Sequence, residues 1–155
     1  MSERFECQRC GKCCREEKVL LTSEEIARVR NFLKTGEEFF EPFGFVSFKD
    51  ALVIIAHKMN KTEEGCFFYD KQDKSCKIYP VRPYACRLFP FLAEKGRLAA
   101  NKACPGVGRG KEADPNELES LTAKGEQASQ ADFEMLKRFL EAKGLDGVEG
   151  VENRE

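Results

Sequence analysis

Cysteine dominates the chemistry that this sequence could support. Four of the eight cysteines in the 155-residue chain stand in the segment CQRCGKCC at 7–14. Thiolates repeated every third residue can turn toward one point, as a soft metal ion or an iron–sulfur cluster requires. The spacing therefore predicts a metal centre whose ligands are Cys7, Cys10, Cys13, Cys14, Cys66, Cys76, Cys86 and Cys104.

The adjacent pair Cys13–Cys14 is a less common feature. Neighbouring side chains usually diverge, so two joined cysteines are better placed to serve two sites, or two edges of one cluster. The alternatives are that some thiols are simply buried, since free cysteine packs as a small hydrophobe, or that they form disulfides. A run of this density, followed by four more cysteines, favours metal ligation over both.

The ligand type leaves the metal open, because zinc and iron–sulfur clusters both accept four thiolates. A C-x2-C-x2-C run is typical of bacterial ferredoxins, whose last ligand is remote and followed by proline, and here Pro105 follows Cys104. Eight ligands would equally supply two four-cysteine zinc sites. We predict a 4Fe–4S cluster, with zinc as the alternative.

Basic residues stand close to the cysteines along the sequence. A four-thiolate zinc site carries net negative charge, and burying it without compensation is costly. We predict that Arg82 and Arg87 contribute to binding the cofactor, by donating hydrogen bonds to sulfur or by offsetting its charge. Arg87 directly follows Cys86. The alternative is that both are ordinary surface cations.

Composition excludes several classes of partner. The formal net charge is −1, from 26 basic and 27 acidic residues, which gives no reason to propose nucleic acid or an anionic membrane. No apolar run is long enough to cross a bilayer, and the N-terminus lacks the hydrophobic segment of a secretory signal. We therefore expect a cytoplasmic protein whose cysteines are kept reduced. With His57 as the only histidine, the metal site should be rich in sulfur.

Mostly short elements would have to position these residues. A capping box of Thr22 and Glu25, followed by apolar residues at helical spacing, predicts a helix over 22–35. Apolar runs predict strands at 51–56, 65–69 and 76–79, the last two forming a hairpin. Prolines in 80–91 allow only a short helical turn opening at Pro83, and Lys95–Gly96 predicts a further hairpin. The Phe-rich segment 37–48 is expected to be an irregular loop.

The C-terminal part predicts a helical tail. The glycine-rich segment 105–113 is expected to be a linker, and Asp114 with Pro115 predicts a helix start. Gly125 leaves one broken helix or two open, Gly144 predicts the end, and 145–155 should be loose. The predicted fold is a small α+β, metal-stabilised domain with short β-hairpins, an N-terminal helix and a C-terminal helical tail. We divide it into a cysteine-cluster domain at 1–110 and a helical extension at 111–155.

Four segments carry a resemblance to a known family. They are FECQRCGKCC at 5–14, VLLTSEEIARV at 19–29, GCFFYD at 65–70 and CKIYPVRPYACRLFPF at 76–91, with Cys104 closing the set. In this combination the chain resembles the YkgJ-like cysteine-cluster family, whose domain is described as zinc- or iron-chelating. The resemblance covers roughly residues 5–106. Flagellin lysine N-methylases resemble the same domain, which implies an iron–sulfur cluster and a link to methyl transfer.

Three functions are consistent with these observations. We predict first a cytosolic metal-binding protein that holds an iron–sulfur cluster or zinc through its multi-cysteine site. The alternatives are a cluster-dependent enzyme or enzyme subunit, of the protein lysine methylation or redox type, and a metal trafficking protein. No catalytic residue can be named, and the absence of a recognisable S-adenosylmethionine motif favours a protein that is not itself an enzyme.

Overall fold

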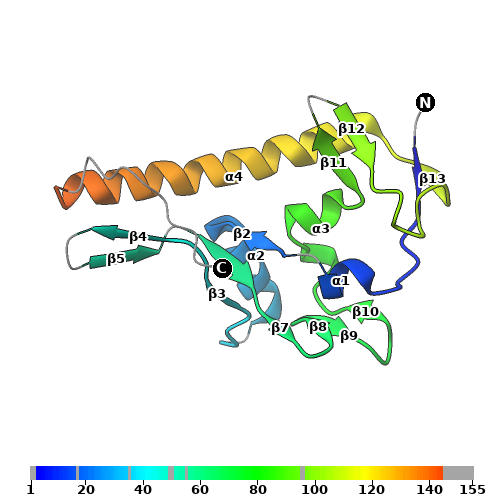
Figure 1. Cartoon of the computed structure of the whole chain (residues 1–155), viewed down its shortest axis with the longest axis horizontal. Helices are drawn as coiled ribbons and strands as arrows, with labels where there is room; N and C mark the ends of the chain where they lie inside the picture. Colours follow the sequence, from blue (N-terminus) through cyan, green and yellow to red (C-terminus); the bar gives the residue numbers. More distant parts are fainter. Residues whose placement is uncertain are drawn as a thin grey trace.

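A long C-terminal helix runs along one side of a group of short strands and helices in the computed structural model of the chain (Figure 1). The structure describes residues 3–16, 18–34, 36–48, 51–54, 56–94 and 97–144, so the segment 145–155 that we expect to be loose lies outside it. Within these residues, helices and short antiparallel strand pairs form a small α+β fold, which confirms the predicted class. None of the described helices is long and apolar enough to span a membrane.

The helices differ greatly in length. They are α1 (Lys12–Glu16), α2 (Ser23–Leu33), α3 (Tyr84–Leu88) and α4 (Pro115–Ala142), with a 3₁₀ turn η1 at Tyr79–Val81. The strands pair in an antiparallel manner, most of them two by two. The pairs are β1 (Arg4–Phe5) with β13 (Lys111–Glu112), β4 (Phe45–Phe48) with β5 (Ala51–Ile54), β7 (Lys61–Thr62) with β8 (Gly65–Cys66), β9 (Tyr69–Asp70) with β10 (Ser75–Cys76), and β11 (Phe91–Glu94) with β12 (Arg97–Ala100). One sheet has three strands, in the order β2 (Leu20–Leu21), β6 (His57–Met59) and β3 (Phe40–Pro42).

The hydrophobic core joins α2 to strands β2 and β6 and to the turns near β9 and β10. Its buried members are Leu21, Ile26, Val29, Phe39, Met59, Phe68 and Ile78. Helix α2 buries Ile26 and Val29 one turn apart, as the predicted helix over 22–35 requires, and Lys34 ends it in a left-handed conformation. Cys66 and Cys76 pack against the edge of this core. The core therefore extends directly to two of the cysteines.

The prediction of an irregular loop at 37–48 is wrong. Strand β3 pairs with β6, with Phe40 opposite Met59, and strand β4 pairs with β5. Pro42 and Gly44 argued against a strand, because proline and glycine are depleted in strands. The pairing of β3 with β6 nevertheless stabilises a strand there. The predicted strand over 51–56 is confirmed in its first four residues, as β5.

The region 61–76 forms two hairpins, whereas we predicted one hairpin over 65–79. Strand β8 pairs with β7, and β9 pairs with β10 across the expected polar turn. The turn at Phe67–Phe68 separates β8 from β9, because Phe68 is drawn into the core with 2% of its surface exposed. Two other predictions are confirmed, namely the β11–β12 hairpin and the helical turn α3, which begins directly after Pro83.

Helix α4 is one continuous helix, which settles the choice that Gly125 left open. Asp114 caps it by accepting a hydrogen bond from the Asn116 amide at 2.9 Å, as expected. Gly125 faces α3, where a Cβ atom would lie 3.4 Å from the Cβ of Tyr84. The carboxylate of Asp132 accepts a hydrogen bond from the Ser23 amide at 2.8 Å. Helix α4 therefore packs against α3 and the start of α2.

The glycine-rich segment 105–113 is not a free linker, contrary to our prediction. Strand β13 pairs with β1, and the Gly108 amide donates a hydrogen bond to the Arg4 carbonyl at 2.8 Å. A Cβ atom on Gly106 or Gly110 would collide with Glu6. The glycines therefore allow this segment to lie directly against the N-terminal residues, an interaction between segments about a hundred positions apart that no local pattern indicates.

Candidate metal centre

All eight cysteines line a single cavity with a volume of ≈ 800 Å³. They come from separate parts of the chain: Cys7 and Cys10 precede α1, Cys13 and Cys14 lie on α1, Cys66 on β8, Cys76 on β10, Cys86 on α3, and Cys104 follows β12. Cys7 and Cys10 are exposed and the other six are half-buried. The fold thus brings every predicted ligand to one place.

The contact between α1 and β8 brings Cys13 and Cys14 on α1 close to Cys66 on β8. Helix α1 was not predicted, because the cysteine-rich run reads locally as a loop with Gly11 at its turn. Gly65 adopts a φ of +127°, and a Cβ atom there would lie 2.9 Å from the carbonyl oxygen of Cys14. The absence of a side chain at Gly65 therefore lets the backbone of α1 approach the strand that carries Cys66.

The thiols on α1, β8, β10 and α3 form one electrostatic group. The pKa of Cys14 is raised by a side-chain hydrogen bond with Cys13, by burial, and by the nearby thiols of Cys13, Cys66 and Cys76. Burial raises the pKa of Cys66 and of Cys76. Burial, with the neighbouring thiols of Cys66, Cys76 and Cys13, raises the pKa of Cys86 to about 12. In the metal-free protein the thiols of Cys14, Cys66, Cys76 and Cys86 are therefore protonated at neutral pH.

Both members of the adjacent pair Cys13–Cys14 line this cavity and are joined by a hydrogen bond between their side chains. The sequence-based expectation was that neighbouring side chains diverge toward two sites or two edges of one cluster. The short helix α1 presents both thiols to the same space. This geometry agrees better with two thiols at two edges of one centre than with two thiols at two separate sites.

The backbone around Cys7 and Cys104 is held by the pairing of the N-terminal segment with 105–113. The Glu6 amide donates a hydrogen bond to the Gly106 carbonyl at 3.1 Å, and the Cys104 amide donates to the Asn101 carbonyl at 3.0 Å. These contacts keep the residues that flank the two cysteines adjacent. Cys7 and Cys104 thus reach the cavity from sequence positions almost a hundred residues apart.

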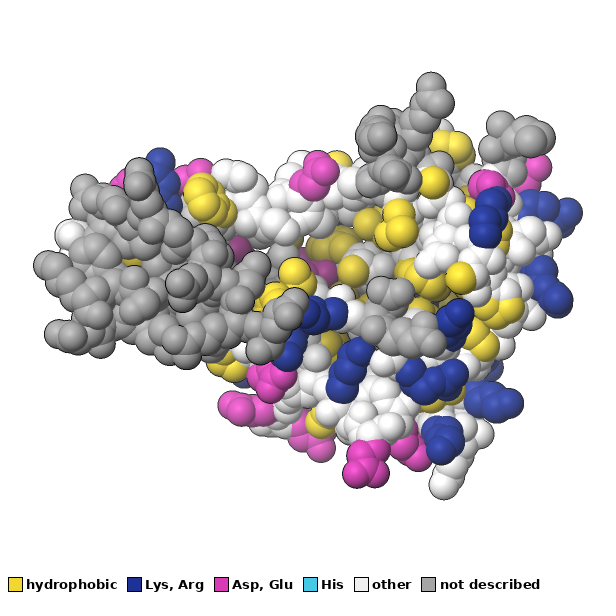
Figure 2. Space-filling model, in the orientation of Figure 1, with side chains coloured by type: hydrophobic (Ala, Val, Ile, Leu, Met, Phe, Trp, Pro, Cys, Tyr) yellow, Lys and Arg dark blue, Asp and Glu magenta, His cyan; other side chains and the backbone are white. Residues whose placement is uncertain are grey.

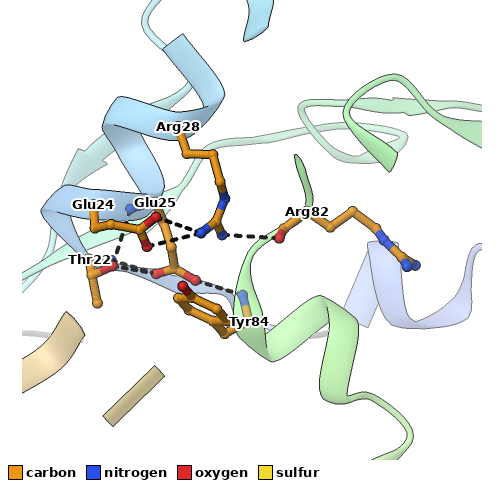
Figure 3. A network of polar contacts seen from close by, with 6 residues as sticks. All are labelled: Thr22, Glu24, Glu25, Arg28, Arg82 and Tyr84. Carbon is orange, nitrogen blue, oxygen red and sulfur yellow. Dashed lines mark hydrogen bonds and ion pairs between the residues drawn. The ribbon is translucent and has the colours of Figure 1, made fainter. Parts of the chain in front are cut away.

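A buried carboxylate fixes the helix that carries Cys86 (Figure 3). Glu25 is 3% exposed. Its Oε2 atom accepts hydrogen bonds from the amide and hydroxyl of Thr22, both at 2.8 Å, and its Oε1 atom accepts one from the Tyr84 amide at 2.6 Å. Arg28 donates to Glu24 and, at 3.3 Å, to the Arg82 carbonyl. One side chain thus caps α2 and the first turn of α3 together.

The two predicted cofactor-binding arginines lie in different surroundings. Arg82 lines the cavity, its guanidinium lies 3.6 Å from the centre of the Tyr79 ring, and it lowers the pKa values of Cys76 and Cys86 against the effect of burial. Arg87 is exposed on α3 and is not among the residues that line the cavity. The role of Arg87 toward a cofactor stays a prediction.

Sequence reasoning missed Lys61. It stands opposite Cys66 in the β7–β8 pair and lowers the pKa of that thiol, against the effect of burial. Its Nζ atom donates a hydrogen bond to the Arg15 carbonyl at 3.0 Å, which joins β7 to α1. Recognising the separate β7–β8 hairpin would have placed this lysine beside the cysteine, because residues directly opposite in an antiparallel pair have neighbouring side chains.

The donor set of the cavity fits a soft metal. Its potential ligands are thiols, and no aspartate, glutamate or histidine that the structure describes is part of the lining. Thiolates select zinc and iron–sulfur clusters over hard cations such as magnesium or calcium. Within the residues that the structure describes, no three Cys, His, Asp or Glu side chains are grouped closely enough to hold a metal ion. Ligation therefore requires the thiols to move closer together than they stand.

A comparison with protein families found a match over most of the chain. A family model described as "CxxCxxCC: Putative zinc- or iron-chelating domain" matches residues 6–105, a span that includes all eight cysteines. Comparison with curated proteins found no match, and comparison with solved structures found none either.

Replacing Glu25 by alanine should destabilise the protein strongly. The change leaves the Tyr84 and Thr22 amides without their acceptor, and hydrogen bonds to a charged group each contribute about 1.5–3 kcal/mol. We expect the free energy of unfolding to fall by about 2–4 kcal/mol, measured by urea denaturation followed by circular dichroism. The control is Glu24→Ala, which removes a partly exposed pair with Arg28 and should cost about 0.5 kcal/mol. Equal losses for the two variants would contradict the capping role of Glu25.

Gly65→Ala should separate α1 from β8. The added Cβ would press on the Cys14 carbonyl at a φ that strains any other residue, so we expect a loss of about 1–3 kcal/mol in stability. Metal bound per chain after anaerobic reconstitution should fall as well. Gly36→Ala is the matched control, because a Cβ there meets no atom within 4 Å. Normal metal content in Gly65→Ala would show that this contact does not position the thiols.

The affinity of the protein for metal should keep rising at pH values above the ordinary pKa of a thiol. A thiol must lose its proton to bind metal, so affinity increases with pH until the free protein is itself deprotonated. For a thiol with the ordinary pKa of 9.0 the increase ends near that pH, but for Cys86 it continues toward about 12. We would measure zinc affinity by chelator competition from about pH 7 to about pH 10, expecting up to tenfold per pH unit for each protonated thiol. Cys86→Ser should reduce the slope of the upper part of the curve without abolishing it, because Cys14, Cys66 and Cys76 also have raised pKa values. A wild-type plateau at pH 9 would contradict the assignment.

Proposed function

Because the chain belongs to the CxxCxxCC family of zinc- or iron-chelating domains, we propose that its eight cysteines hold a metal centre in the cavity that they line. Membership of this family confirms the resemblance to a cysteine-cluster family. The observation that carries the proposal is the convergence of all eight thiols, from six separate elements and connecting segments, on one cavity. Buried cysteines that served only as small hydrophobes would have no reason to meet.

We favour a 4Fe–4S cluster as the occupant, with zinc as the alternative. The C-x2-C-x2-C run with a remote Cys-Pro supports the cluster, and the purely sulfur donor set is compatible with both. Cys13, Cys66 and Cys76 raise the pKa values of Cys14 and Cys86, so these five thiols are the leading candidates for the ligands. Cys7, Cys10 and Cys104 complete the set.

The protein's own residues prepare the cavity for a negatively charged centre. Binding requires the raised-pKa thiols to release their protons, and the resulting thiolates need compensation in a partly buried site. Arg82 and Lys61 already favour the ionised form of the cysteines near them. The bound centre would tie α1, β8, β10 and α3 together. We therefore expect it to stabilise the fold beyond what the small hydrophobic core supplies.

The proposal extends to the organisation and location of the protein. Residues 1–110 would form the metal-binding domain, and α4 would be a helical extension that supports α3 from outside. Free thiols of this number need a reducing environment, so we propose the cytoplasm as the location.

Metal trafficking is a second candidate function. Cys7 and Cys10 are exposed, unlike the other six cysteines, and exposed thiols are accessible to a competing ligand. In this case the inner thiols would retain an ion while the outer pair receives it or passes it on.

Anaerobic purification with elemental analysis should reveal the centre. We expect a brown protein that absorbs near ~400 nm and contains about four irons and four sulfides per chain. Cys66→Ser should reduce the metal content far more than Cys7→Ser, because Cys66 belongs to the inner group and Cys7 is exposed. A colourless protein with one or two zinc ions would identify zinc as the occupant. Metal released to a chelator within minutes would favour trafficking, and a protein without any metal would contradict the proposal.

A further inference from the structure

The cavity is larger than a metal centre requires. Its volume of ≈ 800 Å³ falls within the range of about 300–1,000 Å³ that is typical of pockets for small organic molecules. A four-thiolate zinc ion needs only the space between sulfurs that lie about 2.3 Å from it. Much of the cavity is therefore available to another occupant.

Six cationic side chains line this cavity. Among the residues that the structure describes, they are Arg9, Lys12, Lys18, Lys61, Lys74 and Arg82, and no described aspartate or glutamate is part of the lining. In the part of the chain that the structure describes, none of the six forms an ion pair, although Lys58, Lys71, Lys77 and Lys102 all do. The formal net charge of the chain is −1, so this local excess is not a consequence of a basic protein.

One metal centre compensates only part of this positive charge. A four-thiolate zinc site carries about two net negative charges, and two such sites would carry about four. Against six cations, between two and four positive charges remain without a partner. Like charges gathered around a partly enclosed space repel one another, and an anion that enters it relieves the repulsion.

Three of the cations and one group of apolar residues lie on different sides of the cavity. Lys12, Lys61 and Lys74 belong to α1, β7 and the β9–β10 turn, which lie together in the lower part of Figure 1. The apolar side is formed by Leu88 and Phe89 at the end of α3 and by Phe91 on β11, above them in that view. Phe5 packs edge-to-face on Phe91 with ring centres 6.0 Å apart. Figure 2 shows yellow side chains gathered in the upper middle of this face and dark-blue side chains in its lower part and along its right edge.

We infer that the cavity binds an amphipathic small anion beside the metal centre. Its acidic head, a carboxylate or a phosphate, lies among the lysines of α1, β7 and the β9–β10 turn. Its apolar body lies against Leu88, Phe89 and Phe91. The charge arithmetic rests on the proposed metal centre, whereas the cation cluster and the apolar wall are features of the chain itself.

Isothermal titration of the anaerobically purified, metal-loaded protein with octanoate tests the inference. Octanol has the same apolar body without the charge, and acetate has the charge without the body. We expect octanoate to bind at one site per chain, and octanol and acetate to bind at least tenfold more weakly. Octyl phosphate distinguishes the two possible heads, since tighter binding than octanoate identifies phosphate. Octanol or acetate binding as well as octanoate would overturn the inference.

Two double variants provide a matched comparison. Lys12→Gln with Lys74→Gln removes two cavity cations, and we expect octanoate affinity to fall about fivefold to tenfold. Lys71→Gln with Lys77→Gln removes the same charge from lysines that do not line the cavity, and affinity should stay within about twofold. Equal effects of the two double variants would overturn the inference, because the interaction would then depend only on net charge.

Metal content measured on the same samples separates the two proposals. A protein that holds no metal but binds octanoate through Lys12 and Lys74 would refute the metal centre and support the anion site. A protein that binds metal but loses octanoate binding on metal loading would support the metal centre and refute the anion site, because the centre would then occupy the whole cavity.

Discussion

The buried carboxylate of Glu25 is the interaction on which the arrangement of the cysteine-bearing elements depends. It caps α2, whose apolar face belongs to the hydrophobic core, and with its other oxygen it holds the first turn of α3, which carries Cys86. Helix α4 in turn packs on α3 at Gly125. A neutral residue could cap one helix, but only a carboxylate, with two acceptor oxygens, joins both at once.

Two unfavourable electrostatic interactions meet at the cavity, namely repulsion between thiolates and repulsion between cations. Gathering thiols in a partly buried space raises their pKa values, as Cys14 and Cys86 show, because thiolates there would repel one another and lose hydration. Gathering cations around the same space would be unfavourable by itself. Each set compensates the other once the thiols ionise. This reciprocity accounts for part of the positive charge around the cavity, whose lining cations form no ion pair within the described residues.

The regular elements around the cavity are short, so contacts between distant segments hold it together. Strands β1 and β13 join the two ends of the cysteine-bearing region, and the glycines at 106 and 110 permit the backbone approach. Gly65 does the same between β8 and α1. Such close backbone contacts position the cysteines without a large core. They also explain why we expect a bound centre to contribute to stability, since it would cross-link the elements that the core reaches least.

The sequence by itself determined the family, the small α+β class, the cysteine content of the candidate site and several elements, namely α2, α3, the β11–β12 hairpin and the start of α4. These depend on residue type, capping side chains and short-range periodicity, which a single segment contains. Only the tertiary structure decided that Cys13 and Cys14 face one cavity, that Lys61 stands opposite Cys66, that 37–48 forms strands, and that 105–113 pairs with the N-terminus. Those outcomes depend on hydrogen bonds and close packing between segments far apart in the chain. The residues of a single segment do not indicate which distant segment will stabilise it.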